Sequence, residues 1–519
     1  MIKKYLLLLF IVFSHFFCLI AEEGAVEKSF AQKIDAFVGE AINGPMCQLL
    51  GFGPNSLNFG GFPFIIIVLL FGGIFFTLRL GFINIKLFKH GIDCVRGKYD
   101  NPDDDGEISH FKALTSALSA TVGLGNIGGV AIAIATGGPG AILWMWIVAF
   151  FGMSMKYTSC TIAQVYRRIS PEGKVLGGPM VYLEDGIKDR FPKLLVLGKV
   201  FGVVAAVFTV MASFGGGNLF QGKVTYAIAT TVTKTEAGDV TTGAWIFGIV
   251  LAALVGMVII GGIKRIGSVT SKLVPLMCLC YSLICIFIIV FNIEKVPAMF
   301  SSIFTQAFSE NAMYGGFLGV LIKGVMRAAF SNEAGLGSAS IAHAAAKTKE
   351  PVREGVVAML GPFIDTIIVC TMTALAILIT DMHVLINDMN LPEGGSAFKG
   401  AVLTAHAFGS VHESLQIFLV VAAFIFAYST MISWSYYGER ATEYLFGTAG
   451  IVPYRVVYTV LVAIGPVMSM GNVLDFADFM LLSMAIPNII GLVFLSPVLV
   501  EKTKSYISRL NSGEMKPVE

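Results

Sequence analysis

Two short segments place glycines and polar side chains inside long apolar runs. Gly-Leu-Gly occurs at 123–125, where Asn126 follows it, and again at 335–337, where Glu333 precedes it. Glycine costs about 1 kcal/mol relative to alanine inside a helix, so both segments predict interrupted helices. An interruption frees main-chain N–H groups, which attract an anion, and carbonyl groups, which attract a cation. A site for a small zwitterion together with a metal cation would use both.

Close helix packing is the alternative explanation for these small residues, because glycine and alanine let two backbones approach. It explains Gly128, Gly129 and the neighbouring alanines well. It does not explain why polar side chains accompany both segments, namely Asn126, Ser331, Asn332 and Glu333. We therefore expect a true break at both places.

Three polar side chains in apolar segments are candidates for the site. The amide of Asn126 could donate to a carboxylate or offer its oxygen to Na⁺, or it could merely bridge two helices. Glu333 and Asp365 are acids in apolar segments, where ionisable residues are usually functional. Pairing of Glu333 with Arg327 or Lys323, or of Asp365 with another partner, would be a structural alternative.

Further candidates lie on two later segments. Gln221 follows Asn218 on the apolar run 195–231, and the segment Phe426 to Arg440 carries Ser429, Thr430 and Trp434. Hydroxyl and main-chain oxygens suit a hard cation such as Na⁺, and residues four apart share one face of a helix. Hydroxyls that bond back to their own helix are the alternative.

Motifs of soluble catalysis and nucleotide binding are missing. The sequence contains no H-E-x-x-H, no P-loop and no G-x-S-x-G, so we expect neither an enzyme nor ATP-driven chemistry, and no cofactor. His343 and His406 carry no signal of a site.

The composition sets the class of protein. Of 519 residues, 55% are hydrophobic and only 13% are charged, whereas soluble proteins carry about 25% charged residues. The chain is therefore predicted to be a polytopic protein of the cell (inner) membrane, embedded in the lipid bilayer. A net charge of +2 argues against nucleic acid as a partner.

The order of apolar and charged stretches predicts the layout. Residues 1–21 resemble a secretory signal, with an uncleaved first helix as the alternative. An exported segment over 22–60 and an extra transmembrane helix over 61–81 follow. Basic loops alternate with acidic ones, as the positive-inside rule requires, and 501–519 form a cytoplasmic tail. Ten more crossings are expected near 112–136, 140–165, 195–231, 244–262, 268–292, 315–346, 355–380, 412–437, 453–470 and 476–499.

These ten crossings form two sets of five. The predicted breaks lie in the first crossing of each set, and the sets start on opposite sides of the membrane because five is odd. The sequence therefore predicts an inverted repeat, with units at 108–292 and 300–500. The expected fold is an all-α polytopic membrane protein with a 5+5 inverted repeat and one extra N-terminal helix, about 11 helices in all.

Several long motifs resemble the alanine or glycine:cation symporter family of the amino acid–polyamine–organocation superfamily. They begin at Gly123 (GLGNIGGVAIAIATGGPGAILWMW), Gly177 (GGPMVYLEDG), Phe330 (FSNEAGLGSASIAHAAAKTKEPVREG) and Ser433 (SWSYYGERATEYLFG). The resemblance covers about residues 60 to 500 and implies the leucine-transporter fold.

The resemblance also implies a function and a site. It implies Na⁺-coupled, sometimes H⁺-coupled, uptake of alanine and often glycine. The implied substrate site consists of Gly123, Gly125, Asn126, Gln221, Asn332, Thr430 and Trp434. The implied sodium site consists of Gly123, Ala427, Ser429 and Thr430, and Glu333 and Asp365 are further functional candidates. One departure concerns Leu124, where the family often has threonine, so a polar group of the pocket is absent.

We therefore expect a secondary active symporter that works by alternating access. A proton-coupled symporter is the nearest alternative. An ion channel is a more distant one, since channel filters usually come from symmetric subunits. An intramembrane enzyme or sensor, with Glu333 and Asp365 as catalytic carboxylates, is another.

Overall fold

The computed structural model describes residues 30–52, 56–59, 61–101, 103–233, 242–260, 262–308, 316–385, 395–515 and 517. The predicted signal over 1–21 lies outside these residues. Helices dominate the described chain, which confirms the all-α class. The described strands form two short antiparallel pairs that the sequence did not predict, β1 (Asn58–Phe59) with β2 (Phe62–Pro63) and β3 (Arg168–Ile169) with β4 (Val175–Leu176).

The helices before residue 300 include three π-helical turns, η1, η2 and η4, and two 3₁₀ turns, η3 and η5. In chain order they are α2 (Phe30–Phe37), η1 (Val38–Asn43), α3 (Gly44–Leu50), α4 (Phe64–Arg79), α5 (Ile83–Lys86), α6 (Phe88–Val95), α7 (His110–Thr121), η2 (Gly125–Gly129), α8 (Val130–Gly137), α9 (Ala141–Tyr166), α10 (Pro179–Arg190), η3 (Pro192–Leu194), α11 (Leu195–Phe214), η4 (Gly215–Leu219), α12 (Phe220–Thr233), α13 (Thr242–Ile259), α14 (Gly262–Phe291) and η5 (Ile293–Lys295).

The helices of the second half also include a π-helical turn, η7, and two 3₁₀ turns, η8 and η9. In chain order its helices are α15 (Val296–Gln306), α16 (Gly316–Asn332), α17 (Ala339–Ala344), α18 (Pro351–Ala358), α19 (Leu360–Pro362), η7 (Phe363–Cys370), α20 (Thr371–Ile379), α21 (Met382–Leu385), α22 (Gly395–Val411), α23 (Glu413–Phe446), η8 (Thr448–Gly450), α24 (Ile451–Ile464), η9 (Gly465–Val467), α25 (Met470–Ser483) and α26 (Ala485–Asn511).

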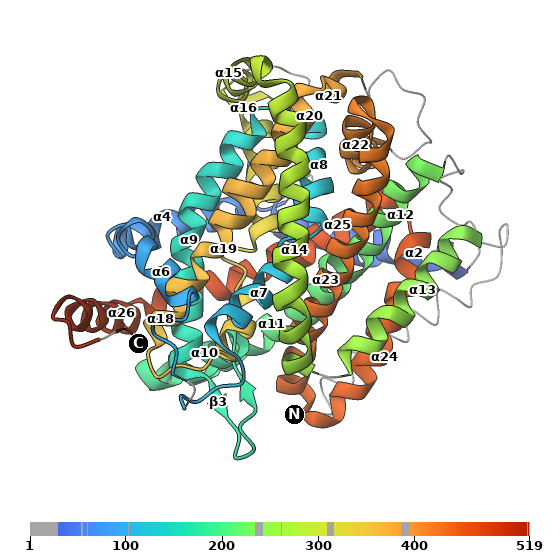
Figure 1. The fold of residues 1–519 in the computed structure, drawn as a ribbon. Coiled ribbons are helices and arrows are strands. Elements are labelled where there is room, and N and C mark those ends of the chain that lie inside the picture. The colour runs from blue at the N-terminus through green and yellow to red at the C-terminus, as the bar shows by residue number, and fades with distance from the viewer. Residues whose placement is uncertain are drawn as a thin grey trace.

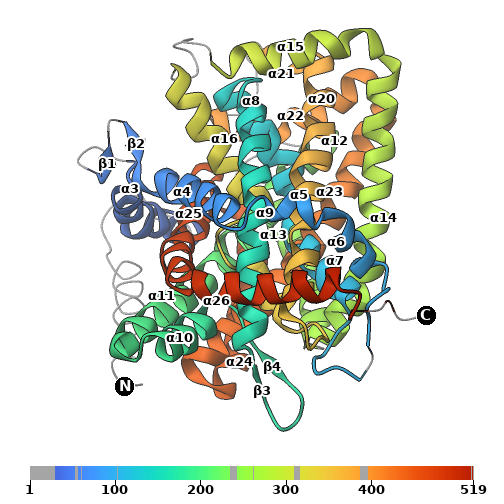
Figure 2. The ribbon, with the colours of Figure 1, turned by 90° about the vertical axis from the view of Figure 1, so that its left-hand side faces the viewer.

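The long apolar helices run together in one bundle. Figures 1 and 2 show α9, α14 and α20 side by side along its length, with α15 at one end and α10 and the β3–β4 hairpin at the other. Helices α4 and α26 depart from this direction. Figure 2 shows α4 and α26 lying across α9, and both pack against it.

Among the described residues, eight helices are long and apolar enough to cross a membrane, and a ninth span results if the bent pair α7 and η2–α8 counts as one. The chain is therefore a multi-pass membrane protein. Helix α4 is apolar but shorter, and the segment α16–α17 is interrupted. Both lie where the sequence predicted crossings.

Both predicted breaks are confirmed. The first bends the chain by 51° between His110–Thr121 and Gly125–Gly137. The second separates α16 from α17 and is built on left-handed backbone, with φ values of 57° at Glu333, 88° at Gly335 and 84° at Gly337. Glycine adopts this conformation without steric cost, so the second Gly-Leu-Gly is required by the turn itself.

Two helices extend beyond the sequence prediction. Helix α22 (Gly395–Val411) lies between the crossings predicted near 355–380 and 412–437, where the sequence analysis expects no helix. Helix α26 continues past residue 500, the predicted end of the second repeat, to Asn511. Near this end the hydroxyl of Tyr506 bonds to Nε2 of His90 on α6 at 2.7 Å.

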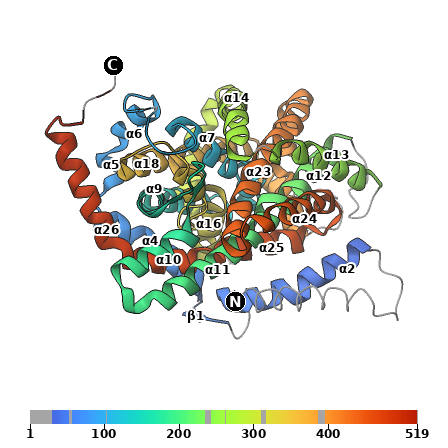
Figure 3. The same ribbon diagram turned by 90° about the horizontal axis from the view of Figure 1, so that it is seen from below.

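The N-terminal helices α2 and α3 lie along one edge of the molecule (Figure 3), where the connecting turn η1 packs against α25. The carboxylate of Asp35 accepts hydrogen bonds from the main-chain N–H and hydroxyl of Ser469, at 3.0 and 2.9 Å, and from Nδ2 of Asn472 at 2.9 Å. These contacts attach the N-terminal segment to the start of α25.

Candidate functional site

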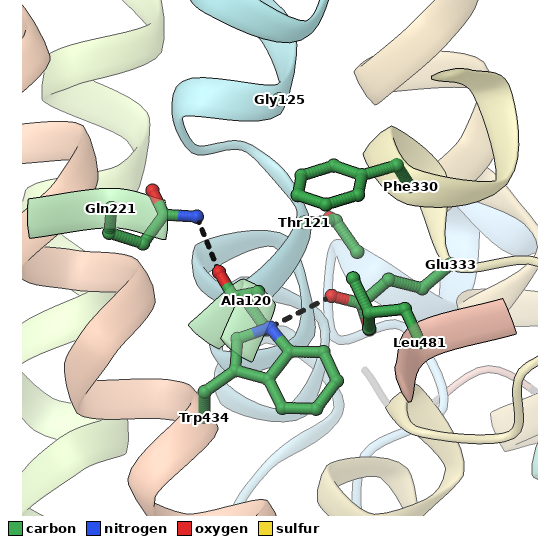
Figure 4. Close-up of a pocket in the computed structure, with 9 residues that line it drawn as sticks. Ala120, Thr121, Gly125, Gln221, Phe330, Glu333, Trp434 and Leu481 are labelled. Carbon is green, nitrogen blue, oxygen red and sulfur yellow. Dashed lines mark hydrogen bonds between the residues drawn. The ribbon is translucent and has the colours of Figure 1, made fainter. Parts of the chain in front are cut away.

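One pocket lies where the two breaks meet. Its walls come from the first break, α12 with η4, the end of α16, α23 and α25. Figure 4 shows Gln221 and Glu333 on opposite sides, with Trp434 below them. The full lining consists of Ala120, Thr121, Gly125, Gly216, Gln221, Phe330, Glu333, Trp434 and Leu481.

Glu333 provides the negative charge of this pocket. Its carboxylate accepts a hydrogen bond from Nε1 of Trp434 at 3.1 Å (Figure 4) and another from the hydroxyl of Ser338. Arg327, a possible partner of Glu333 by its place in the sequence, forms a buried ion pair with Asp478 of α25 instead. The Glu333 carboxylate therefore stays beside the pocket, where it can attract an ammonium group.

Gln221 joins α12 to the first break. Its Oε1 accepts the main-chain N–H of Leu124 at 3.2 Å, and its Nε2 donates to the carbonyl of Gly216 at 2.8 Å. Gly123 lies so close to Thr430 of α23 that an added Cβ would overlap the threonine hydroxyl. Glycine at 123 is thus required by a close approach of backbone to side chain.

Asn126 and Asp365 meet behind the pocket and link the two breaks. Nδ2 of Asn126 donates to the carboxylate of Asp365 at 2.8 Å, and its Oδ1 accepts the N–H of Gly123 at 3.0 Å. The hydroxyls of Ser331 and Thr366 also donate to Asp365, at 2.8 and 2.7 Å. Neither Asn126 nor Asp365 is part of the pocket lining.

Asn332 lies in the wall of the second break and not in the pocket lining. Its Nδ2 donates to the hydroxyl of Thr366 at 3.0 Å, and its Oδ1 accepts the N–H of Ala334 at 2.9 Å. Its main-chain carbonyl accepts a hydrogen bond from Nζ of Lys156 at 2.7 Å. The contacts of Asn332 therefore lie within the second break and hold its main chain in place.

The expected sodium residues gather only in part. The hydroxyl of Thr430 donates to the carbonyl of Ser119 at 3.0 Å, beside Gly123. Ser429 points its hydroxyl to its own helix, at the carbonyl of Phe426, while its carbonyl accepts the hydroxyl of Ser119 at 2.8 Å. Ala427 is fully buried on the same helix.

Helix α22 covers the first break from outside the pocket. The hydroxyl of Thr404 donates to the carbonyl of Ile127 at 3.0 Å, and Ala401 lies within van der Waals reach of a Cβ built on Gly128. The close packing expected of Gly128 therefore has two partners, Val224 of α12 at 3.0 Å and Ala401 of α22.

Two buried polar groups escaped the sequence analysis. Lys156 interrupts the apolar α9, and an ionisable residue inside a span is the signal that could have drawn attention to it. His343, treated above as carrying no signal, bonds through Nδ1 to Glu354 at 2.5 Å, and Glu354 also bonds to His110. No local pattern connects these three residues, because 244 positions separate His110 from Glu354.

Comparison with known proteins identifies the family. A sequence model described as the sodium:alanine symporter family matches residues 53–519. The chain is 43% identical to the sodium/alanine symporter AgcS of Methanococcus maripaludis, over 87% of this chain and 95% of that protein. It is 33% identical to the probable sodium/glutamine symporter GlnT of Bacillus subtilis, over 87% and 89% respectively.

A solved structure supports the same architecture. MhsT in complex with L-phenylalanine, which has a leucine-transporter-like fold, superimposes with a TM-score of 0.53 at 16% identity, over 75% of this chain and 88% of that one. This likeness concerns the fold. Together with the family match over most of the chain and the buried pocket between broken helices, it leads to one conclusion: this multi-pass membrane protein belongs to the sodium:alanine symporter family.

Proposed function

We propose that the protein imports small neutral amino acids, alanine and glycine, together with Na⁺ across the cell (inner) membrane by alternating access. The observation that carries this proposal is the pocket at the junction of two broken helices, with a carboxylate on one side and helix ends on the other. The relative AgcS, which is 43% identical to this chain, is named a sodium/alanine symporter.

The bulky side chains around the pocket support a small substrate. Phe330, Trp434 and Leu481 all line it. The relative GlnT carries glutamine in its name, so the preference for alanine and glycine over larger amino acids is part of the proposal.

The proposed orientation follows the charges. The ammonium group of the substrate faces the carboxylate of Glu333, and its carboxylate faces the main chain at Gly125, at the start of η2. A helix N-terminus attracts anions and a helix C-terminus attracts cations, and the break places both ends at the pocket. Gln221 and Trp434 line the remaining sides.

We place the coupling ion beside Gly123 and Thr430. The hydroxyl of Thr430 and the carbonyl of Ser119 are oxygens of the type that Na⁺ prefers, and they already lie 3.0 Å apart. Ala427 and Ser429 of the same helix complete the proposed set. Asn126, Asn332 and Asp365 act behind the pocket, where they hold the two breaks together.

The units 108–292 and 300–500 are the proposed inverted repeats, and the break in the first helix of each is their shared feature. One cation that crosses 100 mV releases about 2.3 kcal/mol. At about 1.4 kcal/mol per tenfold, a single coupled Na⁺ supports an accumulation of a neutral amino acid on the order of 50-fold.

Uptake by purified protein in lipid vesicles tests this function. Labelled alanine should enter faster with an inward Na⁺ gradient than with K⁺ in its place, and unlabelled glycine should compete better than glutamine. Equal rates in Na⁺ and K⁺ would refute sodium coupling. Under that outcome an inward proton gradient, applied without Na⁺, distinguishes a proton-coupled symporter from a facilitator.

A further inference from the structure

Lys156 is the cationic side chain at the core of the two breaks. It lies within the apolar α9 and is 2% exposed. Its Nζ donates to the carbonyl of Asn332, the last residue of α16, at 2.7 Å. A positive charge at a helix C-terminus is stabilising, so Lys156 holds the end of α16 where the second break begins.

The two carboxylates of the region share this one cation. Glu333 and Asp365 are both buried beside the end of α16 that Lys156 holds. Glu333 directly follows Asn332 in the chain, and Asp365 accepts the hydroxyl of Ser331 at 2.8 Å, so both acids interact electrostatically with Lys156. The other nearby buried cation, Arg327, is committed to Asp478. Among the described residues, one lysine thus faces two acids, and one negative charge stays without a protein partner when all three groups are ionised.

A buried charge without a partner is costly in a membrane interior, and a mobile cation removes that cost. We propose that Lys156 is a fixed internal cation of the transport site, which positions the second break and neutralises one of its two carboxylates. The empty site then retains one uncompensated negative charge and requires a single mobile cation. This inference rests on the proposed Na⁺-coupled function.

The dependence of alanine uptake on Na⁺ concentration tests the role of Lys156 in vesicles. The substitution Lys156→Met keeps the length of the side chain and removes its charge. The Hill coefficient for Na⁺ should rise from about one to about two, because a second cation replaces the missing ammonium and the coefficient is bounded by the number of sites. Lys156→Arg, which keeps the charge, should retain the wild-type coefficient. Lys112→Met, an exposed lysine of α7, controls for the loss of a lysine elsewhere.

A variant without uptake is resolved by a second substitution. If Lys156→Met is inactive, the double variant Lys156→Met/Asp365→Asn restores the charge balance without altering the pocket lining and should regain Na⁺-driven uptake. An inactive double variant, or a Lys156→Met protein with the wild-type Hill coefficient, would overturn the inference. Wild-type uptake that ignores Na⁺ would instead refute the proposed function, so the two failures are distinguishable.

Discussion

The close contact between Gly123 and Thr430 offers the sharpest test of the site. In the substitution Gly123→Ala, the new Cβ would overlap the hydroxyl of Thr430 and lie 3.4 Å from Oε1 of Gln221. To make room, Thr430 must rotate away from the carbonyl of Ser119, which now accepts its hydrogen bond at 3.0 Å. The same movement displaces the hydroxyl that we propose as a sodium ligand.

The expected cost follows from these contacts. A net hydrogen bond contributes about 1 kcal/mol, and overpacking a dense core by one methyl group costs about 1–3 kcal/mol. Together they correspond to roughly 2–4 kcal/mol, which at about 1.4 kcal/mol per tenfold is a loss of roughly 30- to 700-fold. We expect this loss in the apparent affinity for Na⁺ and in the rate of alanine uptake at low Na⁺.

The assay is Na⁺-dependent alanine uptake in vesicles with equal amounts of inserted protein. Gly129→Ala is the matched control, because Gly129 belongs to the same broken helix but its Cβ would meet only the Leu124 carbonyl oxygen, at 3.9 Å. The control should transport within a few-fold of wild type. A Gly123→Ala protein that is as active as the control would refute the argument that backbone approach to Thr430 sets the site.

Three further predictions concern the contacts that hold the frame. Arg327→Met leaves the buried Asp478 carboxylate without its ion-pair partner and should lower the free energy of unfolding in detergent by about 3–5 kcal/mol. The double variant Arg327→Met/Asp478→Leu should recover most of that free energy, and an equal loss in both variants would contradict the prediction. Asp35→Ala removes the bonds to Ser469, so hydrogen exchange over α2 and α3 should accelerate while α9 stays protected, and unchanged exchange would show that these bonds do not hold the segment. Burial lowers the pKa of His90 in the folded protein. The contribution of neutral His90 to stability is therefore complete above the unfolded pKa of about 6.5 and declines as pH falls toward the lowered folded pKa. The substitution His90→Gln should flatten the dependence of thermal stability on pH between 7.5 and 5, and identical slopes in both proteins would exclude a contribution of His90.

The sequence by itself determined the local features of the protein. Apolar runs longer than about 18 residues have few alternatives to membrane helices, so the all-α class and the multi-pass character were predictable. The breaks at Gly123 and Gly335 were also predictable, because a glycine pair beside polar groups weakens a helix wherever it occurs. The family motifs, each a continuous stretch, were recognisable for the same reason.

Only the tertiary structure decided which side chains meet. Asn126 was predicted to hold a substrate but contacts Asp365, 239 residues away, and Glu333 bonds to Trp434, 101 residues away. Lys156 contacts the carbonyl of Asn332 from α9, and the apolar sequence of α9 does not indicate this contact. Such pairs depend on the rotation and crossing of whole helices around the bundle, and a helix that is apolar on every side does not specify in its own sequence which face turns inward.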